Sequence, residues 1–98
     1  MNDSEKNSIL AIGSLNRYSA NQVFLIRVAY ENRGKWVSTA GICNVGGFSG
    51  RGLHKSLPKL ASDGWIEVKP RSPDAGSGQS HRHSFRATQG LVSHVEAR

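Results

Sequence analysis

The chain has little of what would cross-link it or carry it through a membrane. Its 98 residues include one cysteine, Cys43, so no disulfide can form within the chain. A lone cysteine beside Ile42, with no basic residue nearby, is typical of a small buried side chain in a reducing compartment. No stretch approaches the roughly 20 apolar residues that span a bilayer. The opening residues also lack the basic start of a signal peptide. We therefore expect a cytoplasmic protein with no membrane partner.

Acidic residues are scarce, and they are scattered. Seven Asp and Glu stand against thirteen Lys and Arg, which gives a net charge of +6 and favours polyanionic partners. We find no carboxylate pair and no nucleophile beside a base. The glycine-rich run at 46–52 lacks the Gly-Lys-Ser/Thr step of a phosphate-binding loop. We therefore expect no enzyme and no cofactor.

The most informative pattern lies between Ile42 and Leu60, where the spacing is that of a helix-turn-helix. Ile42 anchors one short helix, and Gly47 allows the tight turn that follows. Ser49 is placed to cap a second helix. That helix has one apolar stripe, formed by Leu53, Leu57 and Leu60.

The free face of this second helix is polar and basic, which is typical of an element that enters a DNA major groove. Arginine can bond a guanine edge, whereas lysine mostly neutralises phosphates. Pro58 interrupts the helix, which either kinks at Leu57 or ends there. We expect a kink, because Leu60 keeps the phase of Leu53. The candidate groove residues are Ser49, Arg51, His54, Lys55 and Lys59.

Shorter patterns precede this region. We expect residues 1–7 to be loose and a short helix to follow, with Gly13 interrupting it. Ser19 and Gln22 form a capping box for a helix from Ala20 to Asn32. A small strand is expected at 35–38, and a brief helix from Thr39 to 43 or 44.

The groove helix is expected to end at Asp63-Gly64, and a basic hairpin follows it. Strands are predicted at 65–71 and 81–87 around a loop at 73–80, and Thr88 caps a last helix with Leu91, Val92 and Val95 on its apolar side. We interpret Trp36 and Trp65 as core aromatics. His81 and His83 lack further ligands, so we expect phosphate contact or packing and no metal. The candidate DNA contacts of the hairpin are Lys69, Arg71, His81, Arg82 and Arg86.

This order of elements predicts an α+β winged helix-turn-helix with a three-helix core, a two-stranded β wing and extra terminal helices. Residues 1–18 would be an N-terminal tail and short helix with a candidate dimer contact, and residues 19–98 the DNA-binding domain. The run Leu57-x-x-Leu60-x-x-x-Gly64-Trp65-Ile66, with Phe85-x-Ala87-Thr88-x-x-Gly90, resembles the winged-helix regulators of the MarR and PadR type. Length and layout also resemble the small winged-helix centromere-binding adaptors of plasmid partition systems.

The function expected from these patterns is sequence-specific binding of double-stranded DNA, by a homodimer that represses transcription. One alternative is the same DNA chemistry used in plasmid or phage partition or replication. A second is a protein-interaction module whose basic face meets an acidic partner and binds no DNA. The sequence identifies no small-molecule effector.

Overall fold

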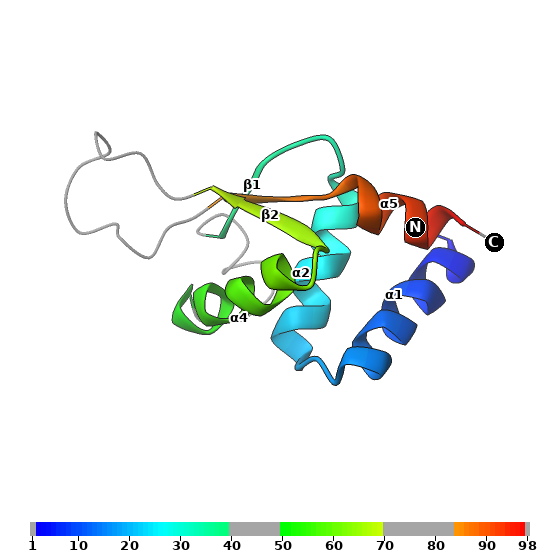
Figure 1. The fold of residues 1–98 in the computed structure, drawn as a ribbon, viewed down its shortest axis with the longest axis horizontal. Coiled ribbons are helices and arrows are strands. Elements are labelled where there is room, and N and C mark those ends of the chain that lie inside the picture. The colour runs from blue at the N-terminus through cyan, green and yellow to red at the C-terminus, as the bar shows by residue number, and fades with distance from the viewer. Residues whose placement is uncertain (1, 40–49, 70–83, 98) are drawn as a thin grey trace.

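A computed structural model describes residues 2–39, 50–69 and 84–97, and at positions 51, 53 and 54 it describes the backbone alone. In these ranges the chain forms four helices and three strands, an α+β fold as predicted (Figure 1). The helices are α1 (Asp3–Asn16), α2 (Ala20–Glu31), α4 (Gly50–Ser62) and α5 (Gln89–Glu96). The strands are β1 (Val37–Ser38), β2 (Ile66–Lys69) and β3 (Ser84–Ala87).

The strands form one antiparallel sheet in the order β1-β3-β2. Phe85 of the middle strand pairs with Val37 on one side and Val68 on the other, so all three side chains point to the same face. Phe85 is fully buried there. The small strand predicted at 35–38 is confirmed at Val37–Ser38. It bonds to the edge of β3, so the sheet has three strands where a two-stranded wing was predicted.

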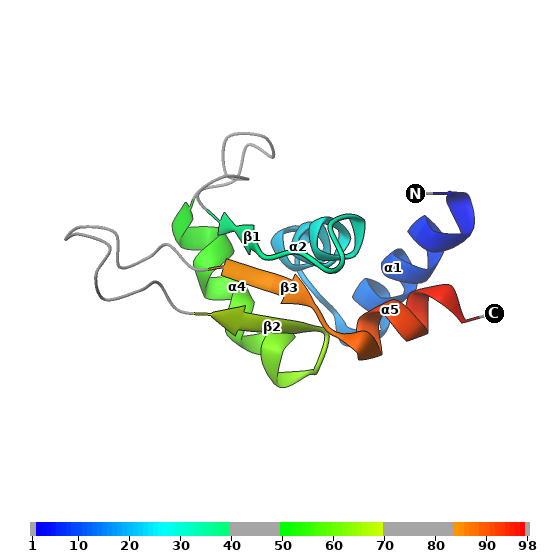
Figure 2. The same cartoon turned by 90° about the horizontal axis from the view of Figure 1, so that it is seen from above.

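Helix α2 lies at the centre of the molecule and packs against α1, α4 and β3 (Figure 2). Its predicted capping box is confirmed. The backbone N–H of Gln22 donates to Ser19 Oγ at 3.3 Å, and the backbone N–H of Ser19 donates to Gln22 Oε1 at 2.8 Å. Because α2 is covered on several sides, its buried side chains are not confined to one face and include Leu25 as well as Ile26 and Tyr30.

The expectation for the N-terminus is wrong. Residues 3–7 are helical, because Asn2 and Glu5 form a capping box that starts α1 at Asp3. Gly13 does not interrupt the helix either. It lies against α2 so closely that an added Cβ would be 2.6 Å from Val23 Cγ2. The prediction was based on apolar positions alone, so it included neither the polar capping box nor the close contact of Gly13 with α2.

Tyr30 of α2 contacts both α1 and α5 at one end of the molecule. Its ring is fully buried, and its hydroxyl donates a hydrogen bond to Glu5 of α1 and lies 3.3 Å from Glu96 Oε2 of α5. Arg33 lies 4.5 Å from the ring centre and 3.8 Å from Glu96. Burial and the bond to Glu5 raise the pKa of Tyr30 to about 12, and the same bond lowers the pKa of Glu5.

The predicted ends of α4 and α5 are confirmed. Helix α4 continues through Pro58, so the alternative in which it stops there is wrong. It ends at the predicted Asp63-Gly64 step, where Gly64 adopts φ +87°. Thr88 Oγ1 accepts the N–H of Leu91 at 3.1 Å and donates to the Gly64 carbonyl at 2.7 Å. One threonine thus caps α5 and ties it to the turn after α4.

Replacing Tyr30 by Phe should lower the free energy of unfolding by about 1 kcal/mol at pH 7, the net value of one side-chain hydrogen bond. Since folding lowers the pKa of Glu5 below its ordinary value of 4.5, its carboxylate stabilises the fold fully above pH 4.5, and this stabilisation is lost as the pH falls through the lowered pKa. The difference between wild type and Tyr30→Phe should therefore shrink toward about pH 3. Urea titrations at both pH values measure it, and an unchanged difference would exclude the Glu5 carboxylate as the partner.

Candidate nucleic-acid interface

Two basic elements meet at one end of the molecule. The first turn of α4 and the ends of β2 and β3 that lead to the hairpin loop lie together, opposite α1 and α5 (Figure 1). Helix α4 is held there by Leu57 and Leu60, which are buried against α2 and β2. The apolar stripe is thus confirmed at both positions, and the opposite side of α4 faces solvent.

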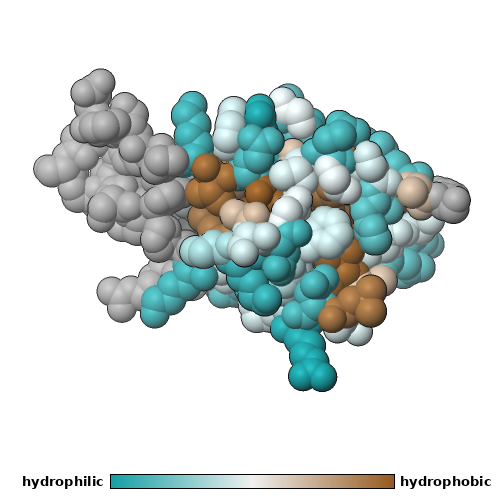
Figure 3. Space-filling view, viewed as in Figure 1, coloured by the Kyte–Doolittle hydropathy of each residue, from teal (hydrophilic) through white to brown (hydrophobic). Residues whose placement is uncertain are grey.

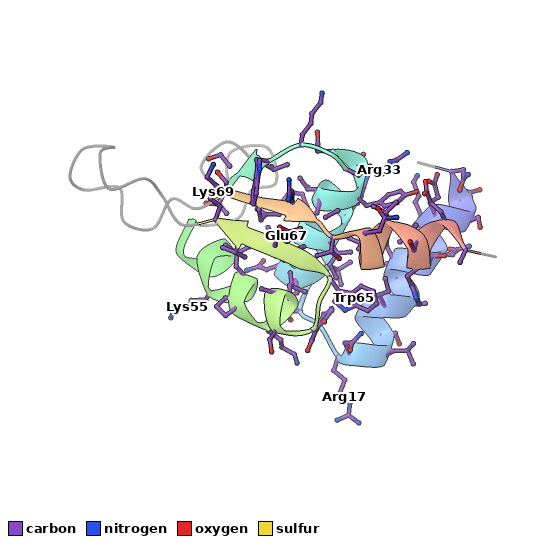
Figure 4. The ribbon with its side chains drawn as sticks, turned by 45° about the horizontal axis from the view of Figure 1, so that its top comes forward. Arg17, Arg33, Lys55, Trp65, Glu67 and Lys69 are labelled. Atoms are coloured by element: carbon purple, nitrogen blue, oxygen red, sulfur yellow. The ribbon has the colours of Figure 1, made fainter. Side chains whose placement is uncertain are left out.

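The two lysines described on α4 differ in their surroundings. Lys55 is exposed, and it forms no ion pair with any residue that the structure describes (Figure 4). Lys59 Nζ lies 3.5 Å from Asp63 Oδ2 and 5.7 Å from the centre of the Tyr18 ring. Tyr18 in turn donates its hydroxyl hydrogen to Asp63. Lys55 is therefore available to a ligand, whereas Lys59 is already engaged within the protein.

Tyr18 links the turn after α1 to the end of α4 through this contact. Its pKa is raised well above its usual range by burial and by the hydrogen bond to Asp63, so it stays a neutral donor. The cluster of Tyr18, Lys59 and Asp63 braces the C-terminal end of α4. It does not include Lys55, which lies one turn earlier on the helix.

The outer face of the sheet carries the basic residues described in the hairpin. Arg86 lies directly opposite Glu67 in the strand register, and its Nη2 is 3.1 Å from Glu67 Oε2. Glu67, Lys69 and Arg86 lie on the outer face, since Val68 and Phe85 face inward. Figure 4 shows Lys69 and Lys55 extending from different elements at this end.

The interpretation of Trp36 as a core aromatic is wrong. It is 40% exposed, because its neighbour Val37 faces the core with Phe85 and the alternation of the strand turns Trp36 outward. The guanidinium carbon of Arg86 lies 4.6 Å from the ring centre, and Lys69 Nζ lies 5.5 Å from it. Trp36 thus gathers two cations on the sheet surface, a role that its place beside Val37 could have suggested.

Trp65 is a different case. It is partly buried and packs against the core, with its ring centre 5.3 Å from that of His94 and the two rings inclined by 67°. This agrees with its interpretation as a core aromatic. The two tryptophans therefore occupy opposite environments.

Several candidate residues lie outside the described part of the chain. These are Ser49, Arg71, His81 and Arg82, together with His83, Cys43 and the turn at 45–47. For Arg51 and His54 the structure places the backbone on α4 but describes no side chain. Their roles stay predictions from the sequence.

Over residues 2–39, 50–69 and 84–97, no three His, Cys, Asp or Glu side chains lie close enough together to hold a metal ion. No helix in the same ranges is long and apolar enough to cross a membrane. Comparison with protein-family models, curated proteins and solved structures finds no match for this chain.

The cluster of Trp36, Lys69 and Arg86 makes a spectroscopic prediction. A sulfated polyanion such as heparin should draw the two cations from the ring and change its fluorescence, because cation–π contacts compete with ion pairs. We expect the change in wild type and in Trp65→Phe, but not in Trp36→Phe. An equal change in the two variants would show that the polyanion does not bind at this cluster.

Proposed function

We propose that the chain is a winged helix-turn-helix protein that binds specific sequences of double-stranded DNA and represses transcription as a homodimer. The observation that carries this proposal is the placement of α4 and the β2–β3 hairpin at one end of the molecule. A helix braced from behind, next to a basic hairpin, can enter a major groove while the hairpin contacts the flanking backbone.

The topology supports the same proposal. In a winged helix, a short strand between the first two core helices joins the edge of the wing. Here β1 follows α2 and bonds to β3, on the side away from β2. Helix α4 precedes the hairpin directly and packs on α2 and β2. The positive charge of +6 supplies the attraction to phosphate that such binding needs.

The proposed roles divide along the two elements. On α4, Lys55 neutralises phosphate, and Arg51 and His54, with Ser49 before the helix, are the candidates for base contacts. On the wing, Lys69 and Arg86 contact the backbone beside the groove, with Trp36 holding them in place. The remaining wing candidates are Arg71, His81 and Arg82.

The pair of lysines on α4 gives a matched test. Lys55→Ala should weaken binding and lower the slope of log K against log salt by about 1, since one phosphate contact is lost. Lys59→Ala should change the slope less, because Asp63 already neutralises that charge. The target is first found by footprinting on genomic fragments, and affinities are then measured at two salt concentrations.

Two results would contradict the proposal. One is binding that never exceeds the affinity for random competitor DNA. The other is equal effects of Lys55→Ala and Lys59→Ala, which would mean that the first turns of α4 do not face the nucleic acid. Wild-type protein that binds no DNA but captures an acidic protein would favour an interaction module instead.

A further inference from the structure

An apolar groove runs between α1 and α2, and it reaches Tyr18, which contacts the C-terminal end of α4. Its volume is about 490 Å³, and apolar side chains of both helices form most of its lining. The lining includes Ile9 and Leu10 of α1, and Ala20, Val23 and Phe24 of α2. Leu10 is 60% exposed at this groove, which is unusual for a large apolar side chain among the described residues.

Charges are arranged symmetrically about Leu10. Asp3, the first residue of α1, precedes it by seven residues, and Arg17, the left-handed residue that caps the end of this helix, follows it by seven. Neither forms an ion pair with any residue in the described ranges. The Arg17 side chain extends away from the body of the molecule (Figure 4).

This spacing matches a second copy of the same helix in the opposite direction. If two α1 helices cross at Leu10, Asp3 of each copy lies opposite Arg17 of the other. Antiparallel alignment also brings each negative helix end near a positive one. The apolar groove and its flanking charges are then complementary to themselves, as a two-fold interface requires.

We propose that the protein forms a homodimer through antiparallel contact of α1 with α1, in which Leu10 of each copy fills the groove of the other. This inference names the surface through which the homodimer of the proposed function would form. It rests on the proposed function only in giving the dimer a role in DNA binding. The first turn of α4 lies at the opposite end of the molecule from α1, so this contact does not involve it in either copy (Figure 2). Ion pairs between Asp3 and Arg17 set the antiparallel direction.

The chain contains a matched control for Leu10. Leu15 lies on the same helix and is 81% exposed, but it does not line the groove, since five residues turn the helix by about 140°. Figure 3 shows hydrophobic surface over the C-terminal half of α1. Exposure alone therefore does not show which leucine belongs to the proposed interface, whereas the position of each leucine around the helix does.

The first experiment is sedimentation velocity on the full chain without DNA. Leu10→Glu should raise the dimer dissociation constant by at least about 100-fold, because two leucines leave the interface. Leu15→Glu should change it less than about three-fold. Circular dichroism of both variants checks that they keep their helices.

The second experiment exchanges the charges. Asp3→Arg alone and Arg17→Asp alone should each weaken the dimer by about ten-fold through repulsion, and the double variant should regain most of the wild-type affinity. Recovery in the double variant cannot arise from a general loss of folding. It tests the antiparallel direction as well as the surface.

Several results would overturn this dimer. Wild-type chain that stays monomeric at about 0.1 mM would do so, because specific interfaces associate well below that concentration. Equal effects of the two leucine variants, or no recovery in the double variant, would exclude this face. Lys6 and Arg27 also line the groove. A monomer that binds decanoate at Val23 and Phe24, seen by chemical shift, would therefore assign the groove to a small apolar acid instead. None of these results depends on DNA binding.

Discussion

The rest of the structure depends on the packing of Phe85, which is buried on the middle strand of the sheet. Val37 and Val68 flank Phe85 from the two neighbouring strands, and α2 packs behind the sheet. The two-residue strand β1 has no other partner in the described sheet. Directly after β3, Thr88 caps the start of α5 and donates a hydrogen bond to the Gly64 carbonyl. One buried aromatic side chain therefore positions the hairpin, the last helix and the turn that ends α4.

The basic residues of the proposed interface differ in whether they are already paired with a carboxylate of the protein. Asp63 and Tyr18 hold Lys59, and Glu67 holds Arg86, whereas Lys55 is exposed without an ion pair in the described ranges. Exposed ion pairs contribute little to stability, so these contacts matter more for orienting side chains. Trp36 adds to this by lying beside two cations on the outer sheet face. We infer that the interface is organised before a ligand arrives.

The sequence was a good guide wherever a local rule decides the structure. The caps at Ser19 and Thr88, the turn at Gly64 and the buried positions Leu57 and Leu60 were all predicted correctly. It was a poor guide where distant contacts decide. The outward position of Trp36 follows from the pairing of β1 with β3. The engagement of Lys59 follows from Tyr18, which is far away along the chain. Neither contact is encoded in local spacing.

The proposal that α4 and the sheet face next to it form one nucleic-acid interface can be tested by NMR titration with a short DNA duplex. We expect the largest chemical-shift changes in the first turns of α4, at Lys69 and Arg86, and at the indole of Trp36. Helices α1 and α5 should change little. Changes centred on α1 and α5, or an absence of changes at about 0.1 M salt, would contradict it.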